Sequence, residues 1–233
     1  MSAIDLSTSL SKLPNFDPRA VPVVGVDAHL PAVAASRLSP EFLRQRFVAP
    51  PIWQPELLAD PRVSESVRVP ASVLVPVVQR PRPSVLLTQR TKHLSTHSGQ
   101  IAFPGGKQDA TDVDLRATAL REAREEVGLM PEFVDVLGTL PVYSTGTGFA
   151  ITPVIALVRE GFSLDRNMYE VDEVFEVPLE FLMNPANHCR HVFETPAGRR
   201  EWLSMPYQDG ATERFIWGAT AGMLRNFYRF LSA

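Results

Sequence analysis

The hydrophobic and polar positions of the chain change character near residue 70. Prolines recur throughout residues 1–70, and each one removes a backbone donor and restricts the residue before it. One helix is still predicted, from Ser39 as N-cap to about Phe47, and residues 21–26 predict a short strand. We expect residues 1–69 to form a proline-rich N-terminal extension, packed either on the following domain or on a second subunit of a homodimer. A partly disordered leader is the alternative.

Continuous apolar runs predict buried strands after residue 70. These runs cover residues 71–78, 84–90 and 151–158, and further strands are predicted at residues 99–103 and 134–140 and beside the acids of residues 170–178. The Arg-Pro-Arg-Pro segment at 80–83 separates the first two runs, which predicts a hairpin. A second hairpin is predicted from strands at 190–194 and 200–205, with its turn at Ala197-Gly198.

Two longer segments carry helical signals. Asp112 or Asp114 can cap a helix that ends before Gly128. Residues 213–231 place apolar side chains at helical spacing, which predicts an amphipathic closing helix. The mixed order of strands and helices over residues 70–233 predicts one α+β domain, an α/β/α sandwich with a mixed sheet between helices.

Composition narrows the class of protein. The net charge is −3 and the isoelectric point is near 6.0, so we expect no nucleic-acid partner. No apolar run approaches the ~20 residues that span a bilayer, so we expect no membrane partner either. Cys189 is the single cysteine of the 233 residues, which excludes an internal disulfide and favours a cytoplasmic location. The N-terminus lacks the apolar centre of a signal peptide.

The candidate chemistry lies in the helix predicted after residue 112. Glu122 and Glu126 are four residues apart and therefore stand on one helix face, with Glu125 beside them. Such neighbouring carboxylates repel each other by ~0.2–0.5 kcal/mol per exposed pair. A hard divalent cation, Mg²⁺ or Mn²⁺, would remove this repulsion. Arg121 can hold Glu125 by a charge-assisted hydrogen bond.

Two glycines precede this helix. Gly105 and Gly106 allow a sharp turn with no Cβ in the way, and a backbone carbonyl there could join the metal ligands. A metal beside an open loop suits the attack of water on a phosphoanhydride. The alternative is that residues 121–126 form a solvated helix face laced with salt bridges.

These residues resemble the signature of the Nudix hydrolase family. The stretch from Arg121 to Leu129 matches the second half of that signature at each fixed position. The first half differs, because five residues lead from Gly106 to Asp112 where the family has Glu, and eight residues instead of seven then precede Arg121. The resemblance implies a Nudix fold over residues 70–233.

A second signature upstream is similar to that of the coenzyme A diphosphatase branch. Its matching residues are Leu86, Leu87, Thr88, Arg90, Gly99, Phe103, Pro104, Gly105, Gly106 and Asp109. Thr91 stands where the branch has Ser, and Ser95 stands where it has Arg. The loss of that guanidinium removes a phosphate contact, whereas Arg90 remains as the best candidate for gripping a phosphate.

The resemblance implies a reaction and roles for the acids. It implies hydrolysis of coenzyme A to 4′-phosphopantetheine and adenosine 3′,5′-bisphosphate, with Glu122, Glu125 and Glu126 as Mg²⁺ or Mn²⁺ ligands and Arg121 orienting a carboxylate. Four general-base candidates stay open: Glu122, Glu125, Glu170 and Glu173. Two alternatives remain, a Nudix diphosphatase for a dinucleotide or ADP-ribose and a non-catalytic Nudix ligand-binding module.

Overall fold

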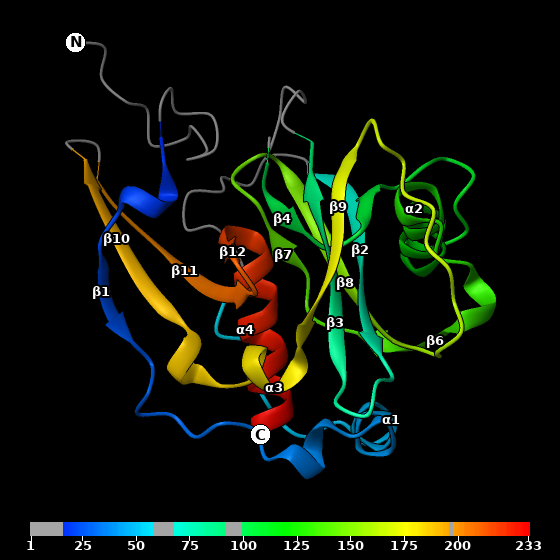
Figure 1. Ribbon diagram of the computed structural model, residues 1–233, viewed down its shortest axis with the longest axis horizontal. Helices are drawn as coiled ribbons and strands as arrows, with labels where there is room; N and C mark the ends of the chain where they lie inside the picture. The colour runs from blue at the N-terminus through cyan, green and yellow to red at the C-terminus, as the bar shows by residue number, and fades with distance from the viewer. Residues whose placement is uncertain (1–15, 58–67, 92–98, 196–197) are drawn as a thin grey trace.

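The computed structural model describes residues 16–57, 68–91, 99–195 and 198–233 (Figure 1). The strands in chain order are β1 (Val23–Val26), β2 (Val69–Val78), β3 (Ser84–Arg90), β4 (Ile101–Ala102), β5 (Gly105–Lys107), β6 (Val134–Thr139), β7 (Tyr143–Ser144), β8 (Phe149–Val158), β9 (Val171–Pro178), β10 (Cys189–Thr195), β11 (Gly198–Asp209) and β12 (Thr212–Trp217). The α-helices are α1 (Pro40–Val48), α2 (Leu115–Val127), α3 (Leu179–Leu182) and α4 (Gly218–Ser232). Short 3₁₀ turns are η2 (Pro18–Ala20), η3 (Ala35–Leu38), η4 (Pro131–Phe133) and η5 (Pro185–Asn187).

A mixed sheet of eight strands forms the centre of the molecule. Strand β2 runs parallel to β8 over ten register pairs, from Val69–Phe149 to Val78–Val158. Strand β3 instead pairs mainly with β9, and it meets β2 only at Val77 and Val78. The predicted apolar runs are therefore strands, but the first hairpin is closed only at its turn. Burial on both faces explains why the runs of β2, β3 and β8 are continuous rather than alternating.

Helices cover both faces of this sheet. On one face, Ala119, Ala123 and Val127 of α2 are buried against β2, β3 and β8, because a spacing of four residues aligns them in one stripe. On the other face, α4 and α3 pack with the remaining core side chains. This confirms the α+β class with a mixed sheet between helices. Asp114 caps α2 through the Ala117 N–H, and Gly128 ends it at φ +71°.

A second sheet, in the order β1-β10-β11-β12, corrects one prediction. The expected helix over 213–231 is wrong at its start, since Thr212–Trp217 is strand β12 and α4 begins only at Gly218. The segment Phe215-Ile216-Trp217 favours a strand, and β11 offers it a pairing edge, from Ser204–Trp217 to Asp209–Thr212. The hairpin over 190–205 is confirmed as β10 and β11. Ala197 of its expected turn lies outside the described residues.

The extension before residue 70 contributes to the same core. Ser39 caps α1 through the Phe42 N–H, as predicted, and β1 confirms the short strand. Val33, Leu38 and Leu43 are buried with side chains of the central sheet. The division of the chain into an extension at 1–69 and a domain at 70–233 stays a prediction. Along the described residues, no helix is long and apolar enough to cross a membrane.

Candidate active site

Helix α2 and strand β5 bring the predicted glutamates and glycines together. The Gly105 N–H donates to the Glu126 carboxylate at 3.0 Å. At Gly106, an added Cβ would lie 2.6 Å from Cδ of Glu122, so a larger residue there would displace that carboxylate. The expected open loop is wrong for these glycines, because β5 pairs antiparallel with β2. They form a short strand that lies beside the carboxylates.

Glu126 is the most buried of the predicted acids, with 4% of its surface exposed. Burial raises the pKa of its carboxyl to about 7, against the Gly105 hydrogen bond and the charge of Arg90, which lower it. The charges of Glu122 and Glu170 raise this pKa further. Burial also raises the pKa of Glu122, and Arg121 opposes that shift. Negative charge is therefore concentrated between α2 and the segment before β9, where a cation would be stabilised.

Arg121 connects the acids of α2 to the preceding loop. Its guanidinium donates two hydrogen bonds of 2.9 Å to Asp112, the aspartate at the position where the family signature has Glu. The same group lies 2.9 Å from Glu125 and 3.0 Å from Glu122. Thr118 donates to Asp112 as well. The shorter acid of the longer loop is thus the anchor that fixes Arg121, and the Arg121 guanidinium holds the pKa of Asp112 well below its usual range.

The structure separates the three predicted glutamate ligands. Glu122 and Glu126 face β5, whereas the Glu125 side chain is 57% exposed and pairs with Arg121. Arg90, predicted to bind phosphate, ends β3 with its Nη1 3.5 Å from Glu126 Oε1. Arg90 therefore lies at the same site as Glu126 although 36 positions separate them in the sequence. Ser95, which stands where the coenzyme A branch has Arg, falls outside the described residues.

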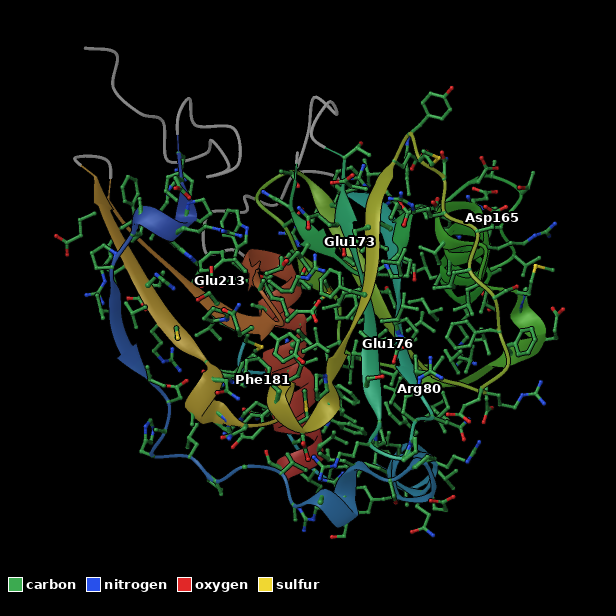
Figure 2. The ribbon with its side chains drawn as sticks, viewed as in Figure 1. Arg80, Asp165, Glu173, Glu176, Phe181 and Glu213 are labelled. Carbon is green, nitrogen blue, oxygen red and sulfur yellow. The ribbon has the colours of Figure 1, made fainter. Side chains whose placement is uncertain are left out.

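Glu170 and Glu173, the two later base candidates, differ in their surroundings. Glu173 on β9 accepts two hydrogen bonds of 2.6 Å from Arg214 of β12, on the side of β9 away from α2 (Figure 2). Arg214 lowers the pKa of Glu173. Glu170 accepts only a long bond of 3.4 Å from Asn167 among the described contacts of its carboxylate, and its charge acts on both Glu122 and Glu126.

The donor set fits a hard divalent cation. Within the described residues, no group of three or more His, Cys, Asp and Glu side chains converges to hold a metal ion. Glu122 and Glu126 nevertheless place two carboxylates side by side, and Mg²⁺ is commonly bound by one or two carboxylates together with water and substrate phosphates. The negative potential around Glu126 supports the same fit. Further ligands would come from the substrate and water.

A cavity of about 770 Å³ adjoins these residues. Arg90, Gly105 and Gly106 form part of its lining, and residues of β11 and α4 form a further wall. The sequence did not predict this wall, because β12 and the start of α4 were expected to form one helix. The glycine at 218, with φ +64°, was the available signal for a break between strand and helix.

Comparison with known proteins places the chain in a family. A NUDIX domain model matches residues 68–186. The Nudix hydrolases NudL of Salmonella paratyphi B and Salmonella newport, both described as uncharacterized, are 46% identical over 156 residues, which is 66% of this chain and 79% of theirs.

Solved structures have lower similarity. A binary complex of Caenorhabditis elegans (C. elegans) Ap4A hydrolase has a TM-score of 0.42 at 21% identity, covering 51% of this chain and 85% of that one. The NUDIX domain of Shewanella oneidensis NrtR complexed with ADP ribose has a TM-score of 0.39 at 23% identity, covering 52% and 78%. The domain match over half of the chain and the 46% identical relatives show that the chain belongs to the Nudix hydrolases, enzymes that act on phosphoanhydride bonds and generally use divalent metal ions.

Proposed function

We propose that this Nudix hydrolase cleaves the diphosphate bond of coenzyme A or a derivative, giving 4′-phosphopantetheine and adenosine 3′,5′-bisphosphate. The observation that carries the proposal is the second signature, which runs from Leu86 to Asp109 and adjoins the Nudix signature. Its Arg90 lies beside Glu126, at a distance from which it can also meet a diphosphate oxygen. An arginine there suits the paired oxygens of a diphosphate.

In this proposal Glu122 and Glu126 are the main ligands of Mg²⁺ or Mn²⁺, and Glu125 assists from the exposed edge. The metal supplies charge neutralisation at phosphorus and a lowered pKa for bound water. Arg121 is a positioning residue, because its bonds to Asp112 and Glu125 hold the carboxylate end of α2 in place. Arg90 binds the substrate, with Gly105 and Gly106 allowing its close approach. Water adds across the P–O–P bridge, and the bridging oxygen leaves with one of the two products.

We propose Glu170 as the group that takes the proton from the attacking water. Glu125 is paired with Arg121 and Glu173 with Arg214, so both carboxylates are less available to accept a proton. Glu170 faces the acids of α2, and its segment is fixed by the Thr91 N–H, which donates to its carbonyl at 3.0 Å. A Glu170→Gln variant should lower kcat by about 100-fold or more, while Glu173→Gln should keep most of the activity. The reverse result would reassign the base.

A second substrate class is another nucleoside diphosphate derivative, such as a dinucleotide or ADP-ribose. Ser95, in place of the arginine of the coenzyme A branch, favours this alternative. A non-catalytic ligand-binding role is the third reading, and the presence of Arg121, Glu122 and Glu126 argues against it. A cytoplasmic location and a homodimer stay part of the proposal, the first because Cys189 is the single cysteine.

A substrate panel tests the proposal. The folded protein is incubated with Mg²⁺ or Mn²⁺ and with coenzyme A, ADP-ribose or a diadenosine polyphosphate, and the products are identified by mass spectrometry. Release of adenosine 3′,5′-bisphosphate from coenzyme A is the expected result. No release with either metal would overturn the coenzyme A assignment, and turnover of ADP-ribose alone would establish the second class.

A further inference from the structure

The segment that connects β8 to β9 carries Glu170, the proposed base, and packs on the C-terminal end of α2. The Asp165 N–H donates to the Val127 carbonyl at 3.0 Å, and the Asn167 N–H donates to the Glu126 carbonyl at 2.9 Å. Figure 2 shows Asp165 beside α2. Both carbonyls lie in the last turn of the helix, where no helical N–H reaches them. They therefore bind the connecting segment next to the proposed metal ligands.

Asn167 uses both ends of its side-chain amide within this segment. Its Oδ1 accepts the Tyr169 N–H at 3.1 Å, which closes an Asx turn. Its Nδ2 donates to Oε1 of Glu170 at 3.4 Å. Its backbone carbonyl accepts the N–H groups of Glu170 and Val171 at 3.0 and 2.8 Å. Asn167 thus sets the backbone conformation around Glu170 and also contacts the carboxylate itself.

Thr91 contacts the same turn from the end of β3. Its N–H donates to the Glu170 carbonyl at 3.0 Å, and its hydroxyl donates to the Tyr169 carbonyl at 2.9 Å. Thr91 directly follows Arg90, the proposed phosphate-binding residue, and it keeps the hydroxyl of the serine that the coenzyme A branch has there. The turn is therefore connected to Arg90 on one side and to Glu126 on the other.

The contact between Asn167 and Glu170 is long, and this suits a base. A short charge-assisted bond would stabilise the ionised carboxylate and make it a weaker base. Glu173 shows that effect, because the two bonds of 2.6 Å from Arg214 lower its pKa. A neutral amide at 3.4 Å orients the carboxylate and leaves it able to accept a proton. Catalytic hydrogen bonds of this kind often tighten only when the substrate is bound.

We propose that Asn167 is a positioning residue for the hydrolysis, which directs the Glu170 carboxylate towards the acids of α2, while Thr91 fixes the other side of the turn. This inference rests on the proposed function, in which Glu170 takes the proton of the attacking water. Among the described contacts, Asn167 occupies Oε1, so the proton passes to Oε2. The water oxygen bonds to phosphorus, and the bridging oxygen leaves. Asn167 touches none of these atoms and acts through Glu170.

An Asn167→Asp variant is the first test. It keeps the acceptor for the Tyr169 N–H and replaces the donor to Glu170 by a second negative charge. With coenzyme A and Mg²⁺ we expect kcat to fall about tenfold and KM to change less than about twofold. ADP-ribose replaces coenzyme A if the substrate panel selects that class, because the proton transfer is the same.

Asn184→Asp is the matched control. Asn184 accepts the Ala186 N–H at 3.1 Å in a turn of the same kind, and its variant should keep the wild-type kcat. An unchanged kcat of Asn167→Asp, where Glu170→Gln lowers it, would overturn this inference and leave the proposed function standing. If Glu170→Gln also keeps the wild-type kcat, the assignment of the base fails together with the inference.

A double variant shows whether Asn167 acts through Glu170. Asn167→Asp combined with Glu170→Gln should have the kcat of Glu170→Gln alone, because the group that Asn167 positions is already lost. Losses that multiply would contradict the inference.

The Thr91 hydroxyl gives a further test, which also serves if Asn167→Asp does not fold. Thr91→Val removes the hydroxyl at nearly the same shape and should lower kcat about threefold or more. Thr91→Ser retains the hydroxyl and should keep the wild-type kcat. Equal values of kcat for the two variants would show that the bond to Tyr169 does not position the base.

Discussion

At the scale of single residues, Glu126 differs from its neighbours in burial. Its carboxyl lies under β5 with a pKa raised to about 7, whereas Glu125 is on the exposed side of the same turn. A buried carboxylate among other acids is unfavourable for stability and favours a bound cation. The two adjacent glutamates should therefore respond differently to the same substitution.

Glu126→Gln should lower kcat for diphosphate hydrolysis by about 100-fold or more, because it removes a charged oxygen ligand from the proposed metal site. The melting temperature in the absence of metal should not fall, since a buried charge is removed. Glu125→Gln is the matched control, with a loss of about tenfold or less. Unchanged hydrolysis by Glu126→Gln would show that the assignment of the metal site is wrong.

Asp112→Asn should lower kcat/KM although Asp112 is not a proposed metal ligand. The change removes the charge that holds Arg121, so the guanidinium would lose its fixed position beside Glu122 and Glu125. We expect a loss of about tenfold in kcat/KM and a lower melting temperature. Asp135→Asn, which breaks the more exposed pair with Arg44, is the control. Equal effects of both changes on kcat/KM would remove the positioning role of Asp112.

At the scale of elements, features set by the local sequence were predicted correctly. Features that depend on pairing with distant segments were missed. The N-cap at Asp114 and the stop at Gly128 lie within α2, so that helix was predicted almost to the residue. Strand β12 depends on pairing with β11, and its apolar positions continue the spacing of α4. The four charges of α2 marked the site, but the contact of Arg90 with Glu126 joins separate elements and follows only from the fold.

The contact of β5 with α2 gives a prediction at this scale. Gly106→Ala would place a methyl group 2.6 Å from Cδ of Glu122, so the carboxylate must move. A displacement of about 1 Å can cost about 100-fold in rate, and we expect at least a tenfold loss in kcat/KM with the fold retained. Gly25→Ala is the control, since nothing lies within 4 Å of its added Cβ. Full activity of Gly106→Ala would show that catalysis does not depend on the position of the Glu122 carboxylate.

At the scale of the whole molecule, buried charges join the two ends of the described chain. Asp27 and Glu56 of the extension pair with Arg225 of α4 at 3.0 and 2.7 Å. His188 lies under the same guanidinium, which donates to its Nδ1 at 3.0 Å, while its Nε2–H donates to the Leu182 carbonyl at 2.8 Å. The bond from Arg225 requires the neutral imidazole, because a protonated Nδ1 cannot accept a hydrogen bond. The packing of the extension onto the domain therefore depends on His188 staying unprotonated.

The sign of the pH dependence follows from this arrangement. Burial lowers the pKa of His188 to about 4, the Leu182 bond and the charges of Asp27 and Glu56 oppose the shift, and Arg225 adds to it. An unfolded histidine titrates near 6.5, so the unfolded chain binds the proton first as pH falls. The stabilisation is complete above about pH 6.5 and is lost as pH falls towards 4, a change of about 3 kcal/mol.

Urea unfolding from pH 7 to pH 4.5 should show this loss as a difference between the wild type and a His188 variant, because the raised pKa of Glu126 changes stability in the opposite direction over the same range. His188→Asn should be less stable at pH 7, because it loses the buried ring and its Nε2–H bond to the Leu182 carbonyl. Between pH 6.5 and 4.5 its stability should fall less than that of the wild type. The exposed His29 offers the control, since His29→Asn should keep the wild-type slope. The carboxylates of Asp27 and Glu56 have lowered pKa values and titrate below this window. A His188→Asn protein that keeps the full slope would assign the pH dependence to other groups and remove His188 from the contact between the extension and the domain.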